Sequence, residues 1–195
     1  MIPFFKHSLI KNKNYIKKTL ASSYLTSGPV CEKAEKLLKM KFKKKYAILT
    51  NSWTNGLITI LLSLKLKPDD EIIIPACTFV ACANVVEMVG AKVVFADIDP
   101  STKLMDVNDC IKKVTKKTKV IMPVHLYGNL FQTKKLKKQI RKNIIIIEDS
   151  AHAFCGEYHN NIIGKYSDFL VFSFYATKSI TCGEGGAIIT NHKLL

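Results

Sequence analysis

Short runs of β-branched and aromatic residues recur along the chain, separated by stretches in which apolar residues have helical spacing. Glycine, proline, asparagine, aspartate and serine mark most of the boundaries. The runs predict strands at residues 46–50, 71–74, 92–97, 119–124, 143–147, 168–173 and 186–190. Strands that alternate with helical stretches predict an α/β fold with an open, mostly parallel sheet.

Most of the stretches between the strands predict helices, each following a capping or turn residue. We expect these helices to begin near Val30, Asn55, Thr78, Asp106 and Thr133. Helices on both faces of a mostly parallel sheet give a three-layer α/β/α arrangement. The start of the chain carries no strand pattern, so we predict an N-terminal arm at residues 1–25 and one domain at residues 26–195.

Polar side chains with useful chemistry follow two of the predicted strands. Asp149 and His152 come after the apolar run that ends at Ile147. Ser173 closes a later strand, and Lys178 lies in the loop beyond it. Because ligands bind at the carboxyl ends of parallel strands, we expect these side chains to lie close together. Pyridoxal phosphate needs an amine for its aldehyde, an anion for its pyridine nitrogen and donors for its phosphate, so these residues predict a site for it.

Each of these residues also has an ordinary structural interpretation. Lysine is so abundant in this chain that one lysine in a loop is most often a solvated surface residue. Asp149 can simply cap a following helix, and the Ser173 hydroxyl can bond to the backbone. The hypothesis depends on the three occurring together.

A second polar turn follows the predicted strand 46–50. Residues 51–56 separate this strand from a helical run at 57–64. The amides at the start of that helix, together with the Ser52 and Thr54 hydroxyls, form a predicted anion site suited to phosphate. Ordinary capping of the helix is an equally good interpretation of the turn taken alone.

Eight stretches together resemble a known family. They are Thr26–Pro29, Asn51–Thr54, Asp69–Ala81, Gly90–Pro100, Pro123–Gly128, Glu148–Ala153, Phe172–Lys178 and Gly183–Ala187. In this order they resemble the N-terminal large domain of the DegT/DnrJ/EryC1/StrS sugar aminotransferases, which are fold-type I pyridoxal phosphate enzymes. The resemblance covers nearly the whole chain.

The resemblance implies a catalytic role for Lys178, which would hold the cofactor covalently and, once freed, move a proton between substrate and cofactor. Asp149 would pair with the pyridinium nitrogen. His152 occupies the position beside the cofactor where the family has glutamine or histidine.

The resemblance also implies the remaining cofactor-binding residues. Ser52, Thr54 and Ser173 would surround the phosphate. Phe79 matches an aromatic residue that packs on the cofactor face, although a core phenylalanine is nearly as good an interpretation. Trp53 stands where many relatives carry a small residue, commonly glycine, so we expect it to narrow the site or to contact the sugar.

The implied reaction is amino transfer from an amino acid, usually glutamate, to a keto group of a nucleotide-linked deoxy sugar, by a homodimer. A related sugar dehydratase carries histidine in place of the lysine, so Lys178 favours the aminotransferase. The family's C-terminal small domain, with its Gly-x-Asn-x-Arg stretch, is absent from these 195 residues. Two further hypotheses follow: a separate chain supplies that domain, or this chain is a non-catalytic fragment of a split or decaying gene.

Composition argues against other classes of protein. The formal net charge is +15, but Arg141 is the only arginine and Phe42 is the only aromatic residue within the lysine runs, so we expect no nucleic-acid partner. The chain has no Gly-x-Gly-x-x-Gly after a strand and no P-loop. No apolar stretch is long enough to span a bilayer, and we expect no membrane partner.

The cysteines and histidines show no spacing typical of a metal site. The six cysteines include no Cys-x-x-Cys pair, so we expect neither zinc nor a disulfide framework. We interpret His125 and His159 as structural. Reduced thiols and the absence of a secretory hydrophobic core predict a cytoplasmic protein.

Overall fold

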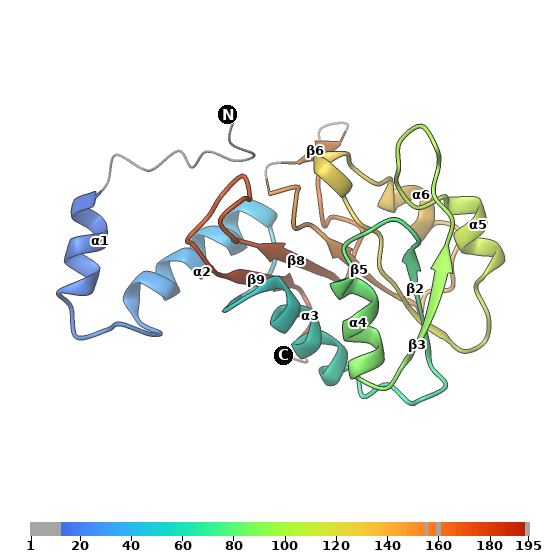
Figure 1. Ribbon diagram of the computed structural model, residues 1–195, viewed down its shortest axis with the longest axis horizontal. Coiled ribbons are helices and arrows are strands. Elements are labelled where there is room, and N and C mark those ends of the chain that lie inside the picture. The colour runs from blue at the N-terminus through green and yellow to red at the C-terminus, as the bar shows by residue number, and fades with distance from the viewer. Residues whose placement is uncertain (1–12, 155, 159–160, 194–195) are drawn as a thin grey trace, which may run out of the picture.

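A seven-stranded sheet forms the centre of the protein in the computed structural model, in which we describe residues 13–154, 156–158 and 161–193 (Figure 1). The strands lie in the order β1, β9, β8, β5, β4, β2, β3. Their bounds are β1 Tyr46–Thr50, β2 Glu71–Pro75, β3 Lys92–Ala96, β4 Thr118–Ile121, β5 Ile145–Asp149, β8 Phe169–Ser173 and β9 Gly186–Thr190. Strand β9 is antiparallel to β1 and β8, and the other neighbouring pairs are parallel. The sheet is therefore mostly parallel, as the sequence predicts.

Helices and one hairpin complete the fold. The helices are α1 Lys13–Leu20, α2 Pro29–Phe42, α3 Trp53–Ser63, α4 Ala81–Met88, α5 Val107–Lys112 and α6 Thr133–Lys137, with a 3₁₀ turn at Leu126–Gly128. Strands β6 Glu157–Tyr158 and β7 Asn161–Ile162 form the hairpin. Helices α3 and α4 lie together against one face of the sheet (Figure 1).

The central strands are apolar on both faces because a core lies on each side of the sheet. In β8, Phe169 and Val171 belong to the core under α3 and α4. Leu170 and Phe172, which point the other way, pack with Leu38 of α2 in a second core. Side chains alternate along a strand, so a continuous apolar run is the pattern expected of a strand covered on both faces.

Strand β5 differs from its prediction in a way that matters for the site. The sequence predicts a strand at residues 143–147 with Asp149 beyond it, whereas β5 continues through Glu148 and Asp149. Asp149 pairs in register with Val171 of β8, and its N–H donates to the carbonyl of Pro123. Polar residues are tolerated in this buried strand because their side chains have hydrogen-bond partners.

Other boundaries also shift for local reasons. Helix α3 begins at Trp53 rather than Asn55, since Ser52 acts as its N-cap. Helix α4 begins at Ala81 rather than near Thr78, because the backbone first makes tight turns. The predicted strand 119–124 ends at Ile121, shortly before Pro123, which has no N–H to donate to a ladder.

Two connections between strands, for which the sequence predicts no helix, contain none in the described residues. The hairpin β6–β7 links β5 to β8, and an irregular loop links β8 to β9. Within the predicted arm, the described residues 13–25 contain helix α1 and no strand. Among the described residues, no helix combines the length and apolar character required to cross a membrane.

Candidate functional site

A cavity of about 560 Å³ opens at the carboxyl ends of the parallel strands. All the side chains that the sequence predicts for the cofactor site line it: Ser52, Trp53, Thr54, Phe79, Asp149, His152, Ser173 and Lys178. They come from the N-cap and first turn of α3, from the loop after β2, and from the ends of β5 and β8 with the loops that follow them. The fold thus gathers residues that are far apart in sequence, while their roles remain predictions.

Asp149 is a buried carboxylate in the lining of the cavity. Its side chain is only 4% exposed, and its Oδ1 accepts a hydrogen bond of 3.0 Å from the Ala151 N–H. Burial raises the pKa of Asp149 above its usual value, even though its hydrogen bonds and Lys178 act in the opposite direction. A carboxylate held in this way is stabilised by a nearby cation, and a protonated pyridine ring is one.

The raised pKa of Asp149 has a consequence for stability. The folded protein holds this proton more tightly than the unfolded chain, so the free energy of unfolding falls as pH rises from the unfolded pKa of about 3.9 through the higher folded pKa. We therefore expect Asp149→Asn to raise the melting temperature of the cofactor-free protein at neutral pH, by about 2–4 °C for each kcal/mol regained.

Calorimetry at pH 7 and near pH 4 checks this expectation. The difference between Asp149→Asn and the parent should shrink as the pH approaches 4, where the unfolded aspartate takes up its own proton. Asp109→Asn is the matched control, because hydrogen bonds lower the pKa of that carboxyl and its loss should not stabilise the protein. An equal or lower melting temperature for Asp149→Asn at pH 7 would contradict the account.

Lys178 lies in the loop between β8 and β9, which backbone hydrogen bonds close at its base. The Phe174 N–H donates to the Gly185 carbonyl at 2.8 Å, and the Cys182 N–H donates to the Phe174 carbonyl at 3.1 Å. The Lys178 side chain is half-buried, and burial lowers its pKa, with Asp149 opposing the shift. An amine with a lowered pKa is more readily available as a nucleophile or base. Lys178 is therefore not the fully solvated residue of its ordinary interpretation.

His152 is oriented by a residue that sequence reasoning missed. Its Nδ1 accepts a hydrogen bond of 3.1 Å from the Tyr127 N–H, and the two rings stack with centroids 5.6 Å apart. Burial, followed by the charge of Lys178, lowers the pKa of His152. With Nδ1 accepting, the neutral ring carries its proton on Nε2. Tyr127 itself is exposed and has a φ of 53°, which no pattern in the sequence indicates.

The start of α3 provides donors for an anion. Ser52 caps the helix, since its Oγ accepts from the Asn55 N–H at 3.1 Å. Trp53 and Thr54 both line the cavity. Among the described residues, no acceptor is found for their backbone N–H groups. A Cβ on Gly186 would come within 2.6 Å of the Ser52 carbonyl carbon, so only glycine lets β9 approach this turn.

The other predicted residues occupy distinct environments. Ser173 Oγ accepts a hydrogen bond of 3.3 Å from the Tyr175 N–H, so its backbone-bonded interpretation also holds. Phe79 is 69% exposed at the cavity, which excludes the alternative of a core phenylalanine. Trp53 is only 6% exposed and belongs to the main core while still lining the cavity. It therefore occupies space that a glycine would leave open.

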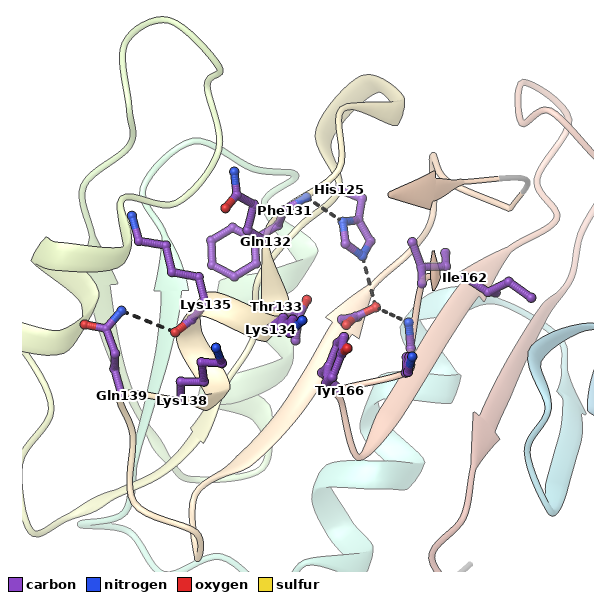
Figure 2. Close-up of a pocket in the computed structure, with 14 residues that line it drawn as sticks. His125, Phe131, Gln132, Thr133, Lys134, Lys135, Lys138, Gln139, Ile162 and Tyr166 are labelled. Carbon is purple, nitrogen blue, oxygen red and sulfur yellow. Dashed lines mark hydrogen bonds and ion pairs between the residues drawn. The ribbon is translucent and has the colours of Figure 1, made fainter. Parts of the chain in front are cut away.

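A second cavity, of about 410 Å³, contains none of the predicted site residues (Figure 2). At its base, His125 Nε2 lies 3.1 Å from Glu148 Oε2, and both side chains are buried. The Phe131 N–H donates to His125 Nδ1, and the Gly164 N–H donates to Glu148. These hydrogen bonds connect the loops around Phe131 and Gly164 to Glu148 of β5. This arrangement agrees with a structural role for His125. His159 lies outside the described residues.

Comparison with known proteins gives concordant matches. The profile of the DegT/DnrJ/EryC1/StrS aminotransferase family matches residues 9–195. GDP-perosamine synthase of Escherichia coli O157:H7 is 36% identical over 197 residues, covering 100% of this chain and 54% of that protein. The chain spans about half the length of the curated relatives it matches.

Two solved structures share the fold. Helicobacter pylori PseC is an aminotransferase involved in the biosynthesis of pseudoaminic acid, and its structure has a TM-score of 0.88 at 33% identity. The match covers 93% of this chain and 49% of the PseC chain. GDP-4-keto-6-deoxy-D-mannose-3-dehydratase of E. coli, with bound hydrated PLP, has a TM-score of 0.92 at 27% identity. The match covers 98% of this chain and 51% of the dehydratase chain. These likenesses confirm the predicted fold class.

Proposed function

Because the chain belongs to the DegT/DnrJ/EryC1/StrS aminotransferase family, we propose that it binds pyridoxal 5'-phosphate and transfers an amino group from an amino acid, with glutamate as the expected donor, to a keto group of a nucleotide-linked deoxy sugar. One observation carries the proposal. A buried aspartate and a half-buried lysine of lowered pKa line the same cavity, at the carboxyl ends of the sheet. A cofactor with a pyridine nitrogen and an aldehyde matches both groups.

The side chains and N–H groups of the cavity residues suit both the phosphate and the ring of the cofactor. The N–H groups at the start of α3 and the Ser52 hydroxyl suit a phosphate dianion. Asp149 suits a ring that carries a positive charge, and Phe79 offers an exposed aromatic face beside the cavity. When bound, the cofactor supplies an electron sink for the substrate carbon.

The residues of this chain supply the remaining steps. Asp149 would pair with the charged ring, and in that pair it would stay ionised and hold the ring nitrogen protonated. Lys178 would hold the cofactor and, as a free amine, would move a proton between the substrate carbon and the cofactor carbon. His152, with its proton on Nε2, offers one further donor at the cavity.

Lys178 favours an aminotransferase over a sugar dehydratase. The fold alone does not separate the two classes of enzyme. The dehydratase structure shares the fold closely, so the choice depends on the residue at the catalytic position. An amine that can bond to the cofactor suits amino transfer, whereas a histidine cannot form that bond. The relatives named for GDP-perosamine and for pseudoaminic acid biosynthesis support an amino sugar as the product.

The proposed assembly is a homodimer. A separate chain that supplies the family's small domain is a second proposed partner. Exposed apolar side chains support an interface along α1 and α2: Tyr15, Ile16, Leu20, Leu37 and Met40. We also propose that the protein acts in the cytoplasm, where nucleotide-linked sugars are made. The free cysteines of the described residues are in keeping with a reducing compartment.

A cofactor titration followed by an amino donor tests the proposal. Trp53 is the only tryptophan and lines the cavity, so we expect pyridoxal phosphate to quench its fluorescence saturably. Glutamate should then change the absorbance of the bound cofactor and yield 2-oxoglutarate. Trp53→Phe is the control, because it should abolish the fluorescence signal while the cofactor still binds. A folded chain that neither binds the cofactor nor reacts would favour the non-catalytic fragment.

A further inference from the structure

A buried thiol holds the second carboxylate oxygen of Asp149. Cys82 is the second residue of α4, it has no exposed surface, and its Sγ lies 3.5 Å from Asp149 Oδ2. The other oxygen, Oδ1, is held by the Ala151 N–H at 3.0 Å. Each oxygen of this carboxylate therefore has one protein donor, and both donors come from residues outside the predicted site.

The direction of the thiol hydrogen bond follows from the number of available protons. Thr78 Oγ1 lies 3.3 Å from Cys82 Sγ, and either atom can donate. An ionised carboxylate only accepts, and a thiol has one proton, so the S–H points to Asp149 and the Thr78 hydroxyl donates to sulfur. Burial, reinforced by the charge of Asp149, raises the pKa of Cys82, which keeps the thiol protonated at working pH.

We propose that Cys82, supported by Thr78, is a positioning residue that fixes the Asp149 carboxylate against the ring nitrogen of the cofactor. This inference rests on the proposed function. The Ala151 N–H alone leaves the carboxylate free to rotate about that single bond, and the thiol fixes its second oxygen. A thiol is a weaker donor than a hydroxyl, so the carboxylate keeps most of its basicity and remains a strong partner for the ring N–H.

The alternative is that Cys82 only fills space, since it packs in the main core with Val85 and Val86. The two roles predict different responses to the cofactor's ring nitrogen. A packing defect should weaken the binding of any ligand of the same shape. A positioning defect should weaken only a ligand whose ring nitrogen bonds to Asp149.

The test compares two ligands on the full chain, pyridoxal phosphate and its analogue with C–H in place of the ring nitrogen. Dissociation constants come from Trp53 quenching and from equilibrium dialysis. We expect Cys82→Val to weaken the binding of pyridoxal phosphate about five- to tenfold, as loss of one hydrogen bond from a weak donor implies, and to leave the binding of the analogue unchanged. Cys82→Ser should restore part of the affinity, because serine keeps a donor but, as a stronger one, lowers the basicity of the carboxylate.

Matched variants keep the test decisive. Cys110→Val removes an equally buried thiol that lies in α5, outside the cavity lining, and should affect neither ligand. If Cys82→Val does not fold, Cys82→Ala removes the same donor without adding volume. Equal losses for both ligands, or no loss for either, would overturn the inference while leaving the proposed function standing.

A cofactor-free measurement separates the failure of the inference from that of the proposed function. If the parent chain binds neither ligand, the proposed function fails, and the hydrogen bond is examined by infrared spectroscopy of the S–H stretch. Asp149→Ala should then shift the Cys82 band to higher frequency, as release of a donor bond requires. A band that does not move would show that the thiol does not hold Asp149.

Discussion

Replacing Asp149 by asparagine is expected to lower the rate of the half-reaction with the amino-acid donor by about 10²–10³-fold, the loss typical of removing one preorganised electrostatic contact. The amide has no charge to hold the ring nitrogen protonated, so the electron sink weakens. The effect should fall on the chemical step more than on cofactor affinity. Stopped-flow absorbance after addition of glutamate measures it.

Two controls separate a loss of chemistry at Asp149 from a loss of structure. Asp149→Asn should fold, and its cofactor-free form should be more stable than the parent at neutral pH, so a lower rate does not come from unfolding. Asp149→Glu keeps the charge but moves it, and should recover only part of the rate. A half-reaction of normal speed in Asp149→Asn would show that this carboxylate does not face the cofactor.

Replacing Lys178 by alanine is expected to remove covalent attachment of the cofactor and to lower amino transfer by about 10⁴-fold or more, because one residue both holds the cofactor and moves the proton. Lys178→Arg keeps the charge without a usable amine and should be equally impaired. A small primary amine added to Lys178→Ala should restore part of the rate, since it can replace the missing base.

The control for Lys178 uses another lysine of this lysine-rich chain. Lys116 is exposed and does not line the cavity, so Lys116→Ala should keep the parent's rate. If Lys178→Ala retained both the covalent cofactor and the rate, another lysine would have to be the catalytic one. Lys178 would then return to its ordinary interpretation as a surface residue.

Much of the fold is predictable because the buried strands are short apolar runs, rich in β-branched and aromatic residues and bounded by turn residues. Strands β1 and β9 have the predicted bounds, and β8 is within one residue of its prediction. Two of the boundary errors have a common cause in misleading local sequence. Polar residues continue strand β5 to Asp149, and the residues at 78–80 do not yet belong to helix α4. Glu148 and Asp149 belong to β5 because the fold supplies partners for them, and those partners come from distant segments.

The candidate site is predictable only to the extent that single residues signal their chemistry. A lysine, an aspartate and a polar turn at strand ends are visible in the sequence, and the structure brings them to one cavity. Cys82 and Tyr127 are not visible in this way. A cysteine in an apolar helix is typical of core packing, and the Tyr127 contact with His152 depends on a loop of irregular backbone.

Reductive trapping of the cofactor tests the central claim most directly. The full chain is incubated with pyridoxal phosphate, reduced with borohydride, digested, and its modified lysines are mapped by mass spectrometry beside Lys178→Ala. The account predicts one stoichiometric label on Lys178 and its loss in the variant. A folded chain labelled at random among its many lysines, or labelled equally in Lys178→Ala, would contradict the assignment of this cavity as a pyridoxal phosphate site.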